Sequence, residues 1–305
     1  MANESLERLS TRGERRTHEH RGSSDRLARG WSLRVIGDSG AMTLAAERHD
    51  AAGERTFRAA ATLLFAVSAL ATVRWCGSMS TGMEMPGGWT MSMAWMQMPG
   101  QTWPAAAATF MAMWILMMVA MMLPSLLPML SRYRRAVLVR DEGRLATLTA
   151  VVGAGYFFAW AVFGAAVYPL GVAVAAAEMR SPALARCVPI ATGFVLVLAG
   201  CVQQTAWKRR ALAHCREVRC ARSLPADGRT AWSHGVDLGV HCGLCCSGLM
   251  AAMLVTDPMD VRTMALIATA VTIERLAPKP ELVARATGVL LVATGVLAIE
   301  RAALG

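Results

Sequence analysis

The segment LTAVVGAGYFFAWAVFGAAVYPLGVAVAAA, residues 148–177, decides the fold, because it holds no charged side chain over its whole length. A transmembrane α-helix needs about 20 consecutive apolar residues, and this run exceeds that length. A soluble core accommodates shorter apolar runs, but not an uninterrupted run that could cross a bilayer. The segment therefore predicts a helix that spans a membrane.

Six further apolar runs lie on either side of this segment, and together they predict an all-α, polytopic helical membrane protein. About seven transmembrane helices are expected, or six if one of the shorter runs does not span. Composition agrees, since 55% of the residues are hydrophobic and 17% are charged, against about 45–50% and about 25% in soluble domains. The other runs are residues 59–75, 105–130, 187–207, 238–255, 261–277 and 284–304.

Basic residues indicate which side of the membrane each loop occupies. Arg and Lys are concentrated in the loops 131–147 and 208–237, whereas residues 76–104 contain neither. The positive-inside rule then places the N-terminus in the cytosol and the C-terminus outside, in the inner membrane of a cell. Residues 1–57 are predicted to be a disordered, basic cytosolic tail, and residues 58–305 the transmembrane helical domain.

The same charge distribution limits the classes of partner. The net charge of +10 does not predict nucleic-acid binding, because the basic residues lie in the tail and in short loops, as topology signals do. The partner expected from this distribution is the lipid bilayer, and the oligomeric state is left open. No Walker motif is present, so ATP-driven pumping by this chain is not expected.

Methionine is concentrated in the outer loop and in the helix that follows it. On a helical wheel the helix methionines occupy one half, and the other half holds Ile115, Leu116, Val119 and Leu123. Thioethers are soft donors that suit Cu(I), and they keep this property in an oxidising compartment. The alternative is that methionine only fills gaps in an apolar helix. The candidate ligands are Met79, Met83, Met85, Met91 and Met93 in the loop, and Met113, Met117, Met118, Met121 and Met122 in the helix.

The tryptophans around this loop are predicted to be anchors at the membrane–water interface. Cys76 and Cys187 also fall on the outer side, where a disulfide between them is conceivable. The tryptophans concerned are Trp75, Trp89, Trp95 and Trp103.

A cluster of thiols begins the fifth helix near its cytosolic edge. Cys242, Cys245 and Cys246 are three and four residues apart and therefore share a helix face, with Met253 further along it. Thiols stay reduced on the cytosolic side, so these residues predict a two- or three-coordinate soft-metal site. His241 is expected to point away from it. The alternative is that each Cys serves as a small buried hydrophobe.

Two further candidates lie at similar depth. Glu274 lies near the cytosolic end of the sixth run, and a carboxylate buried in a membrane is a functional candidate. The competing interpretation is an ion pair with Arg275 or Lys279 at the interface. In the inner loop, Cys215 is followed by a second Cys five residues later, which is a weak metal-binding pattern.

Three of these motifs resemble the signature of a bacterial family of predicted metal-binding integral membrane proteins, a domain of unknown function. They are MWILMMVAMMLPS at residues 113–125, HCGLCCSGLM at residues 241–250 and TIERLAP at residues 272–278. The resemblance covers roughly residues 60–300 and implies a helical membrane fold with metal binding. Ser247 stands where the family has Trp, and Ala211 replaces the first Cys of a loop pair of which Cys215 matches the second.

These observations favour a non-enzymatic membrane protein that binds a soft metal, Cu(I), and transfers, transports or delivers it. No catalytic residue is predicted for this function, and a copper-binding protein is an expected partner. Two alternatives stay open. A Cys-x-x-Cys unit also suits a membrane thiol–disulfide oxidoreductase, and the helices equally suit an assembly factor or a metal sensor.

Overall fold

A computed structural model describes residues 52–78, 82–98, 100–138, 143–216 and 227–304, with the side chains of 138 and 214–216 left out. The chain divides into two compact units, Met1–Ala60 and Ala61–Gly305. The helix Ala52–Ser78 passes from the first unit into the second. It begins inside the segment predicted to be disordered, because residues 52–57 are already helical, and residues 1–51 lie outside the described part.

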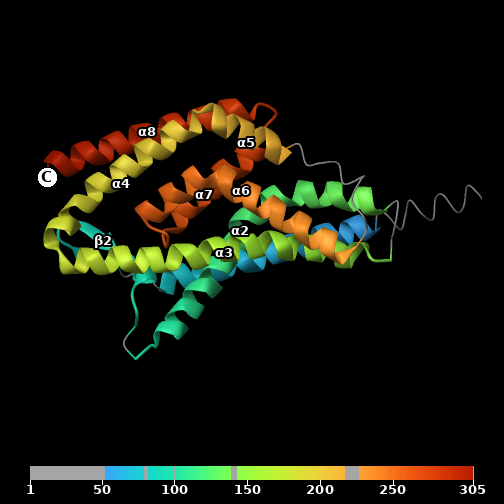
Figure 1. Cartoon of the computed structure of the whole chain (residues 1–305), viewed down its shortest axis with the longest axis horizontal. Helices are drawn as coiled ribbons and strands as arrows, with labels where there is room; N and C mark the ends of the chain where they lie inside the picture. The colour runs from blue at the N-terminus through green and yellow to red at the C-terminus, as the bar shows by residue number, and fades with distance from the viewer. Residues whose placement is uncertain (1–51, 79–81, 99, 139–142, 217–226, 305) are drawn as a thin grey trace, which may run out of the picture. The chain divides into compact units, whose positions relative to one another are not determined.

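The second unit is built almost entirely of helices, as the apolar runs predict (Figure 1). Within the described residues, six helices are long and apolar enough to cross a membrane, and the protein is an all-α polytopic membrane protein. α7 has 16 residues and is shorter than these, which agrees with the six-span alternative. The helices are Ala52–Ser78, α2 (Trp103–Leu138), α3 (Leu145–Arg180), α4 (Pro182–Gln203), α5 (Ala206–Arg216), α6 (Gly228–Thr256), α7 (Val261–Leu276) and α8 (Pro280–Leu304).

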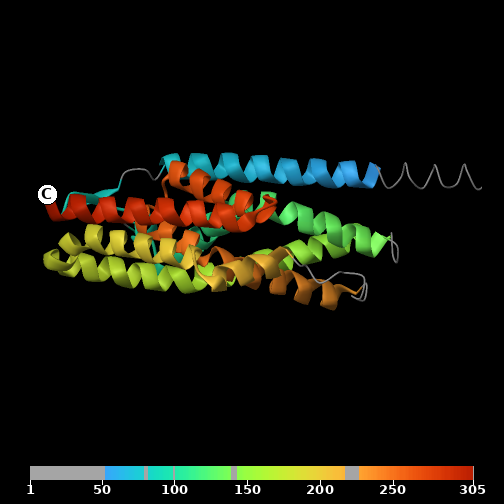
Figure 2. The same ribbon diagram turned by 90° about the horizontal axis from the view of Figure 1, so that it is seen from above.

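Two helix pairs form the most extensive contacts, and glycine permits both. α4 and α8 lie antiparallel along most of their length (Figure 2), and a Cβ added at Gly200 would lie 2.5 Å from the carbonyl oxygen of Gly288. α3 and α6 lie parallel, and a Cβ at Gly239 would lie 2.6 Å from the carbonyl oxygen of Tyr156. Small residues at such crossings let membrane helices pack backbone to backbone. The glycine of α6 therefore brings Tyr156 next to the thiol cluster.

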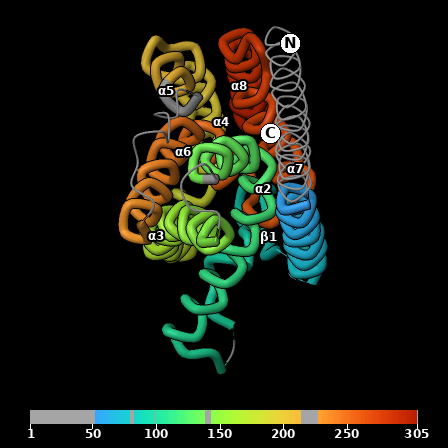
Figure 3. Tube along the Cα trace, turned by 90° about the vertical axis from the view of Figure 1, so that its right-hand side faces the viewer, coloured from blue at the N-terminus to red at the C-terminus, as the bar shows by residue number. Residues whose placement is uncertain are grey.

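α2 is not straight. It changes direction along its length (Figure 1), and Figure 3 shows it between α3 and α7. Pro124 and Pro128 lie inside it, and a proline in a helix removes one backbone hydrogen bond and clashes with the carbonyl four residues earlier. The two prolines therefore explain the change of direction in α2.

A short antiparallel hairpin precedes α2, which the all-helical prediction did not include. Its strands are β1 (Met83–Met85) and β2 (Trp89–Met91), with Met83 opposite Met91 and Met85 opposite Trp89. The turn between them contains Gly87 and Gly88, both with positive φ, a conformation that favours glycine. A 3₁₀ turn, Met93–Trp95, follows β2. Below, the "hairpin end" is the end of the bundle with residues 82–98, and the "basic end" is the end with Lys208 and Arg275.

α7 begins at the hairpin end and runs back towards the basic end. Asp260 is its N-cap: the carboxylate accepts hydrogen bonds from the backbone of Arg262 and Thr263 and from the Thr263 hydroxyl, at 3.1, 3.1 and 2.7 Å. The Thr263 hydroxyl bond and the two backbone bonds hold the pKa of this carboxyl below its usual range. The cap therefore fixes the start of the helix that carries Glu274 and Arg275.

Replacing Asp260 by Ala is expected to destabilise the protein by about 1 kcal/mol at neutral pH, the usual cost of losing an N-cap. Because the folded pKa is lowered, the ionised cap stabilises above the unfolded value of about 3.9, and this contribution disappears as the pH falls through the folded pKa. Denaturant midpoints of wild type and variant, measured from pH 7 downwards, should converge in acid. Asp260→Asn keeps a capping oxygen and serves as the control; a difference that persists unchanged in acid would contradict the assignment.

Candidate functional site

The residues at the centre of the candidate site are Cys242 and Cys246, one turn apart on α6. Their Sγ atoms are 3.9 Å apart, and the side chains are buried, with exposed fractions of 0% and 2%. The Sγ of Cys242 accepts a hydrogen bond from the Tyr156 hydroxyl of α3 at 3.0 Å. It also accepts one from Nη1 of Arg275 on α7, again at 3.0 Å. We refer to Cys242, Cys246, Tyr156 and Arg275 as the thiol site.

Arg275 connects the thiol site to α2. Its Nη1 also donates to the Ser125 hydroxyl at 3.1 Å, and its Nη2 lies 3.3 Å from the sulfur of Met129. Ser125 follows Pro124 in the bent part of α2. The planar fork of donors in a guanidinium makes contact with several acceptors at fixed geometry, which a lysine ammonium does not reproduce. Arg275 therefore holds α2, α6 and α7 together around the Cys242 sulfur.

A buried ion pair lies beside the thiol site. The Nζ of Lys208, on α5, is 2.7 Å from Oε2 of Glu274 on α7, and their side chains are 1% and 2% exposed. Gln203 donates to the other carboxylate oxygen at 2.6 Å, and Lys208 also donates to the backbone carbonyl of Cys245 at 2.8 Å. The predicted pairing of Glu274 with Arg275 or Lys279 at the interface is wrong, because α5 folds back and brings Lys208 to the carboxylate.

The rest of the predicted thiol cluster also lies on the buried face of α6. Cys245 and Met253 are buried, while His241 lies on the exposed side and contacts Asp237, as expected from its position. Among the described residues, no three or more His, Cys, Asp and Glu side chains form a group that could hold a metal ion. The close sulfur pair of this cluster is that of Cys242 and Cys246, 3.9 Å apart.

The methionine face of α2 points into the bundle. The five predicted ligands of this helix are buried, whereas Ile115 is exposed and Leu116 and Val119 are half-buried. Leu123, predicted on the same half as these three, is buried as well, so the split between the two halves does not extend to this residue. Trp114, on the same face, donates to the backbone carbonyl of Trp160 at 2.8 Å. Burial alone is also what a packing role requires, so ligation by these side chains stays a prediction. The buried residues are Met113, Met117, Met118, Met121 and Met122.

The methionines of the hairpin segment differ in their exposure to solvent. Met91 is 1% exposed, whereas Met83, opposite it in the hairpin, is 43% exposed. Met85 and Met93 are half-buried, and Met79 lies outside the described residues. The burial of Met91 has a tertiary cause, since β2 packs into the hairpin end of the bundle.

The tryptophans of this segment attach the hairpin to the helices. The indole of Trp89 donates to the backbone carbonyl of Ala185 on α4 at 2.9 Å. Trp95 packs on Phe110 of α2, with ring centroids 5.4 Å apart. The interpretation of Trp89 and Trp95 as lipid anchors missed this role, because such contacts cannot be read from a loop sequence. They place Met91 at a fixed position.

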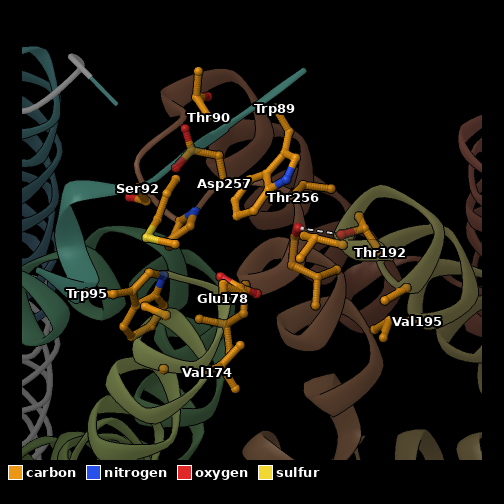
Figure 4. A pocket seen from close by; sticks show the side chains of 18 of the residues that line it. Trp89, Thr90, Ser92, Trp95, Val174, Glu178, Thr192, Val195, Thr256 and Asp257 are labelled. Atoms are coloured by element: carbon orange, nitrogen blue, oxygen red, sulfur yellow. Dashed lines mark hydrogen bonds between the residues drawn. The ribbon is translucent and has the colours of Figure 1, made fainter. Parts of the chain in front are cut away.

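Two cavities open at the hairpin end. One has a volume of about 690 Å³ and is lined by Trp89, Trp95, Glu178 and Asp257, among others (Figure 4). The second, of about 380 Å³, borders Cys76 and Met259. Four residues line both cavities. Thr90 and Met91 belong to β2, Ser92 follows this strand, and Asp257 follows α6.

Several sequence predictions have other outcomes. Cys76 and Cys187 are free thiols, the first buried and the second exposed, so the conceivable disulfide between them is not formed. Cys215 belongs to α5, but its side chain lies outside the described part. Sequence reasoning missed Lys208, Arg275 and Tyr156. Lys208 and Arg275 were assigned to loops or interfaces by charge alone, and Tyr156 carried no distinguishing signal.

The described residues form a helical membrane protein that buries thiols, thioethers and a guanidinium side by side. A family model described as "PpoB2: Copper chaperone" matches residues 111–298, more than half of the chain, and the chain belongs to this family. The match includes the methionine face of α2 and the thiol site, and it supports a copper-related family for the chain that carries these motifs. No curated protein and no solved structure matched the chain.

Proposed function

We infer that this chain is a membrane-embedded chaperone that binds Cu(I) at the thiol site and receives it from methionines at the hairpin end. The observation that carries this inference is the pair of buried sulfurs, Cys242 and Cys246, 3.9 Å apart, with Arg275 against one of them. If one ion formed bonds of about 2.3 Å to both sulfurs, the sulfur–metal–sulfur angle would be roughly 115°. A small increase in the distance between the two sulfurs would bring this angle towards linear coordination.

Charge supports Cu(I) in particular. Two thiolates and one Cu(I) carry a net charge of −1, and the adjacent Arg275 brings the group to zero. A divalent ion with the same two thiolates and Arg275 would leave an uncompensated positive charge away from water, which is costly. Lys208 and Glu274 already neutralise each other, so they leave this balance unchanged. Soft thiolate and thioether ligands also select Cu(I) over the harder divalent ions.

The order of ligands supports movement towards the basic end. Thioethers predominate at the hairpin end and along α2, whereas the close pair of thiols, which binds Cu(I) more strongly once deprotonated, lies near the basic end. Under the positive-inside rule the basic end faces the cytosol of a cell with this protein in its inner membrane. Delivery then requires a partner protein with its own thiols. The roles of Met253, Glu274 and Cys215 as further ligands belong to the same proposal.

A Cu(I) titration of the purified protein against a chromogenic chelator tests this function. Wild type is expected to compete with the chelator, and Cys242→Ser/Cys245→Ser/Cys246→Ser to lose the tightest equivalent. Replacing the hairpin methionines Met83, Met85 and Met93 by Leu, which preserves side-chain volume, is expected to remove only weaker binding.

Cys201→Ser is the matched control, because this thiol lies on an exposed face of α4 and should not change the titration. If wild type does not compete with the chelator at all, copper binding is refuted. The buried Cys pair would then be tested as a redox couple by thiol trapping in cells under reducing and oxidising conditions.

A further inference from the structure

We propose that Cys76, Met91 and Met259 form a second Cu(I) site at the hairpin end, which holds the ion before it reaches the thiol site. This inference rests on the proposed function and deepens it by naming the residues of entry. Cys76 lies near the end of the helix Ala52–Ser78, and Met259 lies in the turn between α6 and α7. The two are brought together only by the fold.

The sulfur geometry suits one ion. The Sγ of Cys76 lies 4.0 Å from the Sδ of Met259, so bonds of about 2.3 Å would meet at roughly 120°. In this structure the Cys76 thiol donates to the thioether. On binding, the S–H bond breaks, a bond between Sγ and Cu(I) forms, and the proton leaves to water, as is general for metal binding by thiols.

Met91 supplies the third soft donor. It is buried, and together with Cys76 and Met259 it lines the cavity of about 380 Å³. One thiolate and two neutral thioethers give a neutral complex with Cu(I). The charged residues around the same cavity are Asp257, Asp260 and Arg262, of which two are acidic and one is basic. The two acidic side chains favour the approach of a cation. If Cys76, Met91 and Met259 served only in apolar packing, acidic neighbours would not be required.

The position of the site connects it to the thiol site. Met259 precedes Asp260, which caps α7, and Arg275 lies near the other end of this helix. The hairpin that carries Met91 also presents Met83 at the surface. Cu(I) captured by the exposed hairpin methionines would therefore meet this cavity before the interior of the bundle.

The test uses the full chain in the background Cys242→Ser/Cys245→Ser/Cys246→Ser, where the thiol site cannot compete. In a Cu(I) titration against a chelator, one equivalent is expected to remain in this background and to disappear with Cys76→Ser. Met259→Leu and Met91→Leu are each expected to weaken it at least about tenfold, since losing a ligand costs no less than losing an outer-shell partner. These substitutions preserve volume, so they remain informative if Cys76→Ser fails to fold.

Met264→Leu is the matched control, because this buried methionine lies at the same end but does not line the cavity. Cys187→Ser/Cys201→Ser controls for the two exposed thiols. Neither should change the remaining equivalent. In selenomethionine protein of the same background, a copper–selenium distance by X-ray absorption would support thioether ligation.

The inference is overturned if the remaining binding is insensitive to Cys76→Ser, Met259→Leu and Met91→Leu, or if no binding remains in the background. Both outcomes differ from failure of the proposed function, which would appear as a wild type that does not compete for Cu(I) or as an unchanged titration of the triple variant.

Discussion

Replacing Glu274 by Leu is expected to lower the free energy of unfolding by about 3–5 kcal/mol, because removing one partner of a buried ion pair leaves an uncompensated charge. The Lys208 ammonium would keep its hydrogen bond to the backbone carbonyl of Cys245 but would lose the carboxylate that balances its charge. The measurement is the denaturant midpoint of the purified protein in detergent, followed by helical circular dichroism.

Removing both charges together should be far less harmful. The double variant Glu274→Leu/Lys208→Met is expected to regain most of the lost stability, since replacing a whole buried pair by apolar residues is often neutral. The control is Glu54→Gln, which breaks the exposed pair between Glu54 and Arg58 at 2.9 Å and should cost only about 0.3–0.5 kcal/mol. A double variant less stable than Glu274→Leu alone would refute the pairing.

The second large effect is expected on copper affinity. Arg275→Leu removes the donor to Cys242 and the positive charge that balances a two-thiolate Cu(I) complex, and affinity for Cu(I) should fall about 10–100-fold, as for other partners of metal ligands. Arg275→Lys keeps the charge but not the fork that reaches Ser125 and Met129, so its affinity should lie between those of wild type and Arg275→Leu. A chelator titration measures each value, and the thiolate-to-copper absorption band reports the ligand set.

Tyr156→Phe separates the chemical from the structural contribution of the thiol site. It removes only the hydroxyl that donates to Cys242 at 3.0 Å, and a smaller loss of affinity in the same direction is expected. Tyr133→Phe is the matched control, because this buried tyrosine of α2 stacks on His234 of α6 instead, with ring centroids 5.8 Å apart. Equal effects of the two substitutions, or a change in melting without a change in copper affinity, would contradict the assigned role.

Much of the fold is determined by local sequence. An uncharged run of bilayer length forms a helix whatever its neighbours, because its backbone groups have no other partners in lipid. The runs therefore predicted α3, α4 and α8 closely. They predicted α6 less well, because this helix starts at Gly228 rather than near 238 and its first turns are polar. Asp227 caps these turns by accepting a hydrogen bond from the backbone N–H of Thr230 at 2.7 Å. Its first turns thus depend on a cap rather than on hydropathy.

The sequence by itself also determined which side chains share a helix face, since a period of 3.6 residues places Cys242 with Cys246 and gathers the methionines of α2. Tertiary structure alone decided what faces them. Lys208 looks like a solvated loop charge until α5 folds back onto Glu274, and Arg275 reaches Cys242 only because α7 lies beside α6. Cys76 and Met259, 183 residues apart, are neighbours for the same reason: periodicity is a property of one helix, whereas contacts depend on which helices pack together.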